Sequence, residues 1–421
     1  MYKTLSGSIL LVLALGGCDD ADPPVLMPDA GAMMTPSDAG APVTYYEDVR
    51  PILAENCVTC HSEGSIAPFT LLSYDEVFEV GERVAEVTHD RIMPPFVVDN
   101  SGECNTYRGA RTLTQDEIDL IGRWVAQGMP EGDPSVPAPP EATLPTLDEV
   151  SSSLEMSIEY SPDDSTNDDY RCFVVDPDWT GTQYLTGYDV RPGNAEVVHH
   201  IIVYAPIDAG VGAEARMREA SETRPGYTCY GDSGVFAIPV VLWAPGAGAV
   251  TFPEGTGIAL DGSIPLIMQV HYNLLEDDGN PDLSHVDLQL ADSVDNVAQM
   301  ALVADFGLSV PPRMESVTNT FEGATVFGPS SNLRVWGAFP HMHTLGRQLR
   351  VEATDGTCMV DVPNWDFNWQ GAFFYETPID LANNTFRLDC TYNTMERDSV
   401  VTWGDGTLDE MCLSFFYVTS Q

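Results

Sequence analysis

The pattern of apolar and polar positions changes three times along the chain. At the start, Lys3 precedes an apolar run over residues 9–15, which is too short to span a bilayer and is typical of a signal-peptide core. Residues 19–43 are rich in Asp, Pro, Ala, Gly and Met, so they predict a flexible tether without a core. Helical periodicity begins at Tyr46, and short β-type runs of Val, Ile, Tyr and Phe follow from residue 156 onwards.

The N-terminus predicts export. Gly16 and Gly17 stand directly before Cys18, and small residues before a cysteine resemble a bacterial lipoprotein cleavage box. We expect residues 1–18 to be a signal peptide and Cys18 to carry a lipid anchor; an ordinary signal peptide cut nearby is the alternative. Both interpretations place the protein in the cell envelope, periplasmic or at the outer surface, where disulfides persist.

The first folded segment is predicted to be a small all-α domain over residues 44–130. Its last helix spans residues 114–128, where Thr114 and Glu117 form a capping box and Gly128 ends the helix. Residues 131–155 are a Pro-rich, acidic linker. After it we expect two antiparallel, jelly-roll-like β-sandwiches, over residues 156–290 and 291–421.

The all-α segment contains Cys57-Val-Thr-Cys60-His61, the attachment motif of a c-type haem. Both thiols would bond the haem and His61 would bind its iron; a redox-active Cys pair is the alternative. Met93 lies between Ile92 and two prolines that would stiffen its loop, so we expect it to be the sixth iron ligand. This arrangement resembles small class I cytochromes c. His89 and Met129 are less favoured candidates for the same position.

The charge of the chain restricts its partners. With 64 acidic and 18 basic residues, the net charge is −46, and Lys3 is the only lysine. Such a surface repels nucleic acid and anionic lipid, so we expect no nucleic-acid partner. The need to keep the protein soluble is sufficient to explain the excess of acidic residues.

Five of the eight histidines lie in short apolar segments of the β region, where loop histidines are not expected: His199, His200, His271, His341 and His343. His341 and His343 are two positions apart, so on a strand both would face one metal ion. His199 and His200 are adjacent and would share an ion only at a bulge, a twist or a strand end. Taken singly, each histidine is more often a hydrogen-bonded structural residue.

Taken in order, four motifs resemble those of the copper type II, ascorbate-dependent monooxygenases, the family of peptidylglycine α-hydroxylating and dopamine β-monooxygenases. They are His199-His200, Gln269-Val-His271-Tyr, His341-Met-His343 and Asp409-Glu-Met411-Cys412. The resemblance covers about residues 156–421. It implies two copper ions across an open cleft, one on His199, His200 and His271 and the other on His341, His343 and Met411. Imidazole suits copper, and a thioether favours Cu(I), the state that meets O2.

The same resemblance assigns further residues. Gln269 and Tyr170 match residues close to the copper sites, and Cys172–Cys229 and Cys390–Cys412 match family disulfides. Cys104 and Cys358 remain and would form a third pair between the helical segment and the second sandwich, although sequence does not fix connectivity.

One departure concerns the substrate. Peptide-amidating members have an arginine two positions before the first histidine of the His-x-His pair, and this chain has Phe339 there, followed by Pro340. Leu413 replaces a polar residue after the tail cysteine. The substrate is therefore expected to be apolar or aromatic rather than a carboxylate-bearing peptide.

The function that the resemblance implies is hydroxylation of a C–H bond with O2, with ascorbate or another one-electron donor. The attached haem would relay electrons from an envelope donor to the copper sites. The alternatives are a haem domain that acts independently, a non-catalytic copper-binding β module, and an electron-transfer cytochrome whose sandwiches dock a partner.

Overall fold

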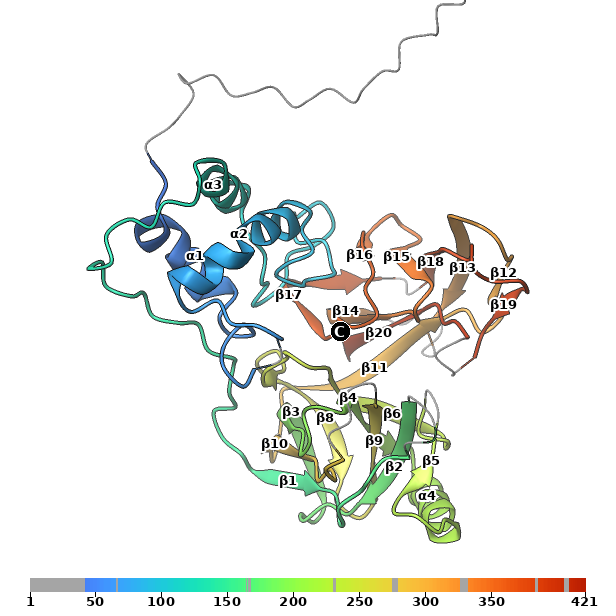
Figure 1. Cartoon of the computed structure of the whole chain (residues 1–421). Helices are drawn as coiled ribbons and strands as arrows, with labels where there is room; N and C mark the ends of the chain where they lie inside the picture. The colour runs from blue at the N-terminus through green and yellow to red at the C-terminus, as the bar shows by residue number, and fades with distance from the viewer. Residues whose placement is uncertain are drawn as a thin grey trace, which may run out of the picture. The chain divides into compact units, whose positions relative to one another are not determined.

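The computed structural model describes residues 42–65, 67–163, 165, 168–229, 232–274, 279–325, 332–382, 385–404 and 409–421. The expected signal peptide, the lipidated Cys18 and the tether up to residue 41 lie outside the described residues. Val43–Gln421 form one compact unit. It consists of a helical segment followed by a region made mostly of β-strands (Figure 1).

The helical segment contains the π-helix η1 (Tyr45–Val49) and the helices α1 (Arg50–Asn56), α2 (Tyr74–His89) and α3 (Gln115–Ala126). The predicted capping box of α3 is present, with the Thr114 side chain accepting from the Glu117 N–H. Gly128 follows the helix with φ +84°, a conformation that glycine adopts without strain. Trp124 is fully buried among the apolar residues of this segment. The prediction of a capped helix that closes the segment is confirmed.

Twenty strands follow among the described residues. They are β1 (Ser152–Glu155), β2 (Asp168–Val175), β3 (Thr182–Arg191), β4 (Val198–Pro206), β5 (Tyr227–Thr228), β6 (Ala237–Trp243), β7 (Val250–Thr251), β8 (Thr256–Asp261), β9 (Leu266–Asn273), β10 (His285–Ala291), β11 (Asn296–Ala304), β12 (Ser309–Val310), β13 (Val317–Ala324), β14 (Leu333–His341), β15 (Gly346–Ala353), β16 (Cys358–Val362), β17 (Phe373–Leu381), β18 (Thr385–Tyr392), β19 (Val401–Thr402) and β20 (Leu413–Ser420). The first of them, β1, lies inside the segment predicted to be a linker.

One nine-stranded sheet runs through both β domains. Its order is β1-β10-β3-β8-β11-β20-β14-β17, with β7 also paired to β3. The junction is β11, which pairs in parallel with β8 of the first domain and antiparallel with β20 of the second. The two expected β domains are therefore present, but the expectation of purely antiparallel pairing is corrected, because β11 joins the domains through backbone hydrogen bonds that include a parallel pair.

Smaller sheets cover the two halves of this long sheet. The five-stranded sheet β5-β2-β9-β4-β6 shares a core with β3 and β10, whereas the four-stranded sheet β13-β18-β15-β16 shares a core with β11, β14 and β20. Strands β12 and β19 form a separate ribbon. Each half is thus a two-layer β structure that buries the inner faces of both its sheets.

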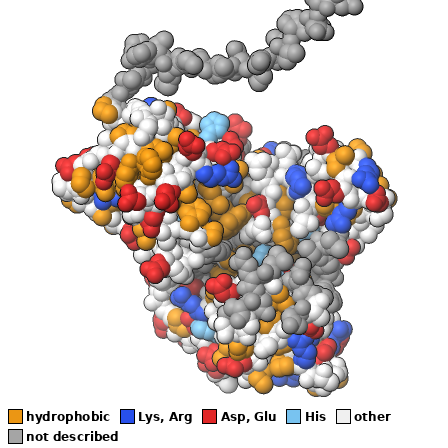
Figure 2. Space-filling model, in the orientation of Figure 1, with side chains coloured by type: hydrophobic (Ala, Val, Ile, Leu, Met, Phe, Trp, Pro, Cys, Tyr) orange, Lys and Arg blue, Asp and Glu red, His pale blue; other side chains and the backbone are white. Residues whose placement is uncertain are grey.

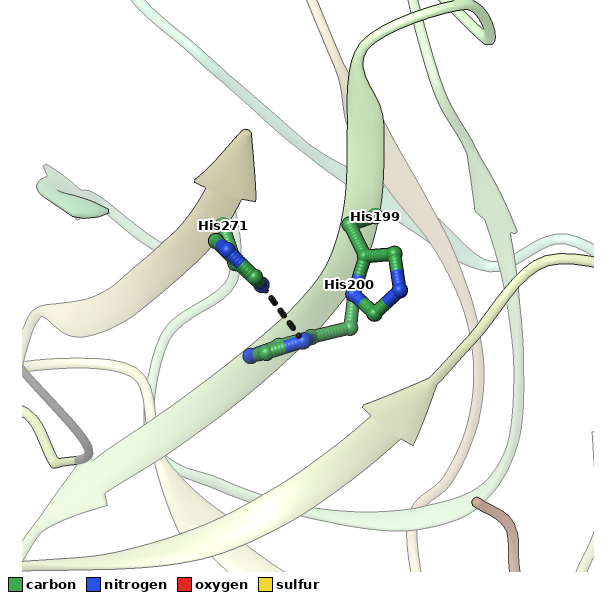
Figure 3. Close-up of side chains that lie close together, drawn as sticks. All are labelled: His199, His200 and His271. Carbon is green, nitrogen blue, oxygen red and sulfur yellow. Dashed lines mark hydrogen bonds between the residues drawn. The ribbon is translucent and has the colours of Figure 1, made fainter. Parts of the chain in front are cut away.

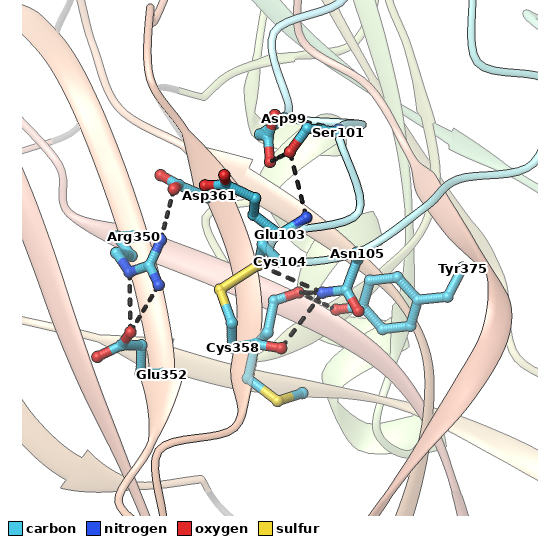
Figure 4. Close-up of a disulfide and its surroundings, with 11 residues drawn as sticks. Asp99, Ser101, Glu103, Cys104, Asn105, Arg350, Glu352, Cys358, Asp361 and Tyr375 are labelled. Carbon is cyan, nitrogen blue, oxygen red and sulfur yellow. Dashed lines mark hydrogen bonds and ion pairs between the residues drawn. A yellow bond between two sulfur atoms is a disulfide. The ribbon is translucent and has the colours of Figure 1, made fainter.

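A segment between α2 and α3 belongs to the core of the second β domain. Val97, Val98 and Tyr107 are buried there, and Tyr107 forms a bridge with Tyr375. The Asn105 amide donates to the carbonyl of Met359 at 2.9 Å. Cys104 is bonded to Cys358 beside these contacts (Figure 4). The expected all-α domain therefore contributes part of its chain to the β region.

One helix of the β region was not expected. Helix α4 (Ala209–Ser221) lies between β4 and β5, and Asp208 caps it by accepting from the Val211 N–H at 2.9 Å. Its sequence is rich in alanine and follows a capping aspartate, which are recognisable helix signals. These signals lie between sequences that are typical of β-strands, so the helix was not predicted.

None of the helices in the described part of the chain is long and apolar enough to cross a membrane.

The packing of Tyr107 yields a stability prediction. Tyr107→Ala should lower the apparent free energy of unfolding by about 3–5 kcal/mol, because it empties a buried aromatic site in the second β domain. Urea unfolding monitored by tryptophan fluorescence measures the change. Ile158→Ala, at an exposed apolar residue, should cost less than about 0.5 kcal/mol. Equal, small losses for both variants would show that the segment around Tyr107 is not part of the core.

Candidate metal centre

Neighbouring strands bring three histidines together in the first β domain. His200 on β4 is the direct register partner of His271 on β9, and the ladder shifts register between Val198 and His200. This irregularity allows the adjacent His199 to reach the same point, as the sequence required of such a pair. Ligand atoms of the three rings lie within 4.8 Å of one another (Figure 3). We call this group the first histidine set.

The ring nitrogens of the first histidine set are oriented for a shared cation. The Nδ1 atoms of His200 and His271 lie 3.2 Å apart, while Nδ1 of His199 is buried without a hydrogen-bond partner. His271 donates its Nε2–H to Asp168 at 2.8 Å, which leaves its Nδ1 lone pair for a metal. A buried orphan nitrogen beside two converging ones fits an ion with imidazole ligands such as copper.

Burial keeps two members of this set, His199 and His200, uncharged. It lowers the pKa of His199 to about 4, and His271 adds to the effect. Burial also lowers the pKa of His200 well below its ordinary value, with His271 and His199 contributing. Neutral imidazole is the form that binds metal, so these residues need not lose protons to accept one at neutral pH.

The second set consists of His341, His343 and Met411. His341 ends β14 and is paired with Leu413, the first residue of β20, which places the preceding Met411 at the same end of the sheet. The rings of His341 and His343 are 5.2 Å apart and nearly perpendicular. Met411 is buried, and its carbonyl accepts from the Tyr392 hydroxyl at 2.8 Å.

Both histidines of the second set use Nδ1 for hydrogen bonds. His341 donates to the Gln370 amide oxygen at 2.6 Å, and His343 donates to the Asp409 carbonyl at 3.2 Å. Their Nε2 atoms carry the lone pairs that a metal would use. Burial lowers the pKa of His341 to about 3, helped by His343 and opposed by Gln370. Two imidazoles and a buried thioether are a donor set that suits copper, and Cu(I) in particular.

Glu410 is a buried residue whose role the sequence did not reveal. Its carboxylate accepts from the backbone N–H groups of His343 at 2.9 Å, Leu345 at 2.6 Å and Met411 at 3.3 Å. Burial raises the pKa of Glu410 to about 7, although these three N–H groups oppose the rise. The side chain ties together the two chain segments that carry the second set. Its position directly before the expected ligand Met411 was the sequence feature that could have pointed to this role.

One segment of the second β domain touches both sets. Phe367 lies at a ring distance of 5.9 Å from His199 with the planes nearly parallel, and 6.2 Å from His343. Its neighbour Asn368 opposes the fall in the pKa of His199 that burial causes. The ring of Phe367 therefore contacts histidines of both domains.

The same segment also holds the second set. Gln370 accepts from His341, as described above, and Trp365 donates its indole N–H to the His343 carbonyl at 3.1 Å. Both sets border one cavity of about 480 Å³. The six residues proposed from sequence are thus arranged as two separate groups on a shared space.

The two other residues expected near copper differ in position. Tyr170 stacks on His271 with ring centres 4.0 Å apart and an angle of 5°. Gln269 donates instead to the Asp232 carbonyl at 2.6 Å, and its amide oxygen is buried without a partner. Gln269 therefore supports the chain near Cys229, while Tyr170 contacts a member of the first set directly.

Three disulfides are formed among the described residues: Cys104–Cys358, Cys172–Cys229 and Cys390–Cys412. Cys390–Cys412 links β18 to the residue directly after Met411. Cys172–Cys229 links β2 to the chain near Gln269. Both pairs brace elements that position the two sets.

In the helical segment, Cys57 and Cys60 are free thiols directly after α1. His61 donates its Nδ1–H to the Phe69 carbonyl at 3.1 Å, which leaves Nε2 for a metal. The less favoured iron ligands are engaged elsewhere: the largely exposed His89 pairs with Asp90, and Met129 packs over Gly81 beside Trp124. Met93 is partly buried in the loop after α2.

Comparison with known proteins gives the class. Residues 154–278 match the N-terminal domain of copper type II ascorbate-dependent monooxygenases, and residues 299–420 match the C-terminal domain. Together these matches cover more than half of the chain. The chain therefore belongs, through these two domains, to the copper type II ascorbate-dependent monooxygenase family.

Individual relatives are distant. A human protein called putative DBH-like monooxygenase protein 2 is 26% identical over 302 residues, covering 65% of this chain and 57% of the relative. Horse dopamine beta-hydroxylase is 26% identical over 274 residues, covering 60% of this chain and 44% of that protein. The chain thus spans about half the length of these relatives. A solved PNGF-II structure has a TM-score of 0.25 at 9% identity, over 64% of this chain and 65% of its own, a likeness too weak to support an argument.

The contact between Asp168 and His271 generates a prediction. Asp168→Asn should weaken Cu(I) binding by the first set roughly 10- to 100-fold, because the carboxylate fixes the tautomer that presents Nδ1. Competition with a Cu(I) chelator measures the affinity, in a His341→Ala background that removes a member of the second set. Asp176→Asn, at an exposed carboxylate, is the control and should leave the affinity unchanged. If Asp168→Asn also leaves it unchanged, this hydrogen bond does not orient the ligand.

Proposed function

We propose that the protein is a copper-dependent monooxygenase that hydroxylates a C–H bond of a small organic substrate. The overall reaction is R–H + O2 + 2 e⁻ + 2 H⁺ → R–OH + H2O. The electrons come from ascorbate or another one-electron donor. The observation that carries the proposal is the pair of imidazole and thioether donor sets that border one cavity, together with membership of the family.

Each of the two sets would hold one copper ion. His199, His200 and His271 would hold one copper ion, and His341, His343 and Met411 would hold the other. Bound copper supplies one-electron redox chemistry and the reduction of O2 beside the substrate. Tyr170 and Asp168 hold His271 in place, and Gln370 and Glu410 do the same for the second set. The apolar wall of the cavity excludes water from the reaction.

Labelled oxygen tests this proposal. The copper-loaded chain is incubated with ascorbate, ¹⁸O2 and a panel of small organic compounds, and mass spectrometry should detect products with one ¹⁸O atom. Met411→Leu should lower product formation roughly 100-fold or more, because it removes the sulfur ligand of the second set. Met395→Leu, at an exposed methionine, is the matched control and should retain activity. Product formation that survives Met411→Leu would contradict the assigned site.

We further propose that the helical segment carries a c-type haem on Cys57, Cys60 and His61, with Met93 as the sixth ligand. The two thiols are unpaired and the His61 tautomer suits iron. Figure 2 shows hydrophobic side chains on the surface of this segment. Its exposed large hydrophobic residues are Phe69, Leu72, Phe78 and Ile92. A small domain with an uncovered apolar face is suited to bind an apolar group. The haem relays electrons from an envelope donor, and the exported chain is anchored through Cys18.

The relay is tested with two reductants. His61→Ala should abolish turnover driven by a reduced soluble c-type cytochrome, while turnover driven by ascorbate should persist, because ascorbate reduces the copper sites directly. His89→Ala is the control and should leave both activities and the haem spectrum unchanged. If His61→Ala does not alter cytochrome-driven turnover, the haem is not the electron relay.

A further inference from the structure

The cavity between the two ligand sets has largely apolar walls. Every second residue of a strand faces the same side, so β4 presents His200 and Ile202 to the cavity, and β20 presents Leu413 and Phe415. Leu302 of β11 lines it beside Phe415, its register partner. Its wall therefore continues the apolar faces of the sheets up to the donor atoms.

The described residues of this wall include no lysine or arginine, and their only carboxylate is Asp232. Asp232 is exposed, and its side chain accepts from the Gly234 N–H at 2.5 Å. Phe339, at the position where an arginine would hold a carboxylate, is buried against Phe374. Among the described residues of the wall, an anionic ligand would meet no cationic side chain, and a cationic ligand would meet only the exposed carboxylate of Asp232, so little would compensate its lost hydration.

Two aromatic residues mark the rim. Phe236 of the first domain and Phe306 of the second line the cavity, yet they are 72% and 66% exposed. The ring of Phe306 lies 4.7 Å from that of Trp403. Exposed aromatic side chains that line one cavity are suited to contact an aromatic ring bound in it. Met411, by contrast, is buried at the inner end of the space.

We propose that this cavity binds an uncharged alkyl-aromatic molecule, with its ring between Phe236 and Phe306 and its aliphatic carbon directed toward His341 and Met411. The inference rests on the proposed function for the identity of the reacting carbon. The cavity volume of about 480 Å³ lies in the range of small-molecule sites. Most of its described lining is apolar, and its one carboxylate, Asp232, is exposed, so selection depends mainly on shape and on the lack of charge in the ligand.

Binding is measured without turnover. The full chain, loaded with Cu(I) under argon, is titrated with ethylbenzene, phenylacetate and phenethylammonium. Quenching of the fluorescence of the cavity residues Trp243 and Trp403 reports binding, and calorimetry checks it. The dissociation constant of ethylbenzene should be at least about tenfold lower than those of both ions. An ion that binds as tightly as ethylbenzene, or no binding by ethylbenzene, would overturn the proposal.

Two variants localise the site. Phe306→Ala changes an exposed rim residue and should weaken ethylbenzene binding by about three- to tenfold, through loss of ring contact. Leu302→Arg places a guanidinium in the wall and should make phenylacetate the tighter ligand, whereas Leu302→Met should keep the original order. Unchanged binding in Phe306→Ala would place the ligand elsewhere, even if Leu302→Arg fails to fold.

The two proposals fail differently. Ethylbenzene could bind tightly and yet give no ¹⁸O-labelled product with ascorbate and ¹⁸O2 at the concentration of O2 in air-saturated buffer. That result would contradict the monooxygenase function and leave the ligand class intact. Efficient hydroxylation of phenylacetate with weak ethylbenzene binding would contradict the ligand class and leave the function intact.

Discussion

The backbone hydrogen bonds of β11 are the constraint on which the rest of the structure depends. This strand pairs with β8 of the first β domain and with β20 of the second, so one sheet extends through both. The first histidine set stands on the sheet that covers one half, and the second set stands at the ends of β14 and β20 in the other. Because the shared sheet joins the halves, both sets border one cavity.

A second constraint is the chain segment from Trp365 to Gln370. It supplies a hydrogen-bond acceptor to His341, a ring to His199 and a donor to the carbonyl of His343. The histidines are therefore held by neighbours from both domains rather than by their own strands alone. Burial keeps His199 and His341 neutral, and neutral imidazoles are the form that metal requires. The positions of these imidazoles and their neutral state therefore both favour a bound metal ion.

Much of this could be predicted from sequence, for physical reasons. The spacing of His341 and His343 fixes their common direction on a strand, and the capping box of Thr114 is a local signal. The contribution of Glu410 could not be predicted, because two of its three N–H partners, His343 and Leu345, lie 67 and 65 residues away in the chain. The same is true of Phe367, whose contact with His199 exists only when two domains meet. The parallel pairing of β8 with β11 also depends on tertiary packing rather than on residue type.

The central claim is that both sets hold copper, and copper content per chain tests it most directly. The full chain is loaded with Cu(I), freed of excess metal, and measured by elemental analysis beside His200→Ala and His343→Ala variants and the double variant. The account predicts two coppers in the parent chain, one in each single variant and none in the double variant. A parent chain that retains no copper, or one whose copper is unaffected by both substitutions, would contradict it.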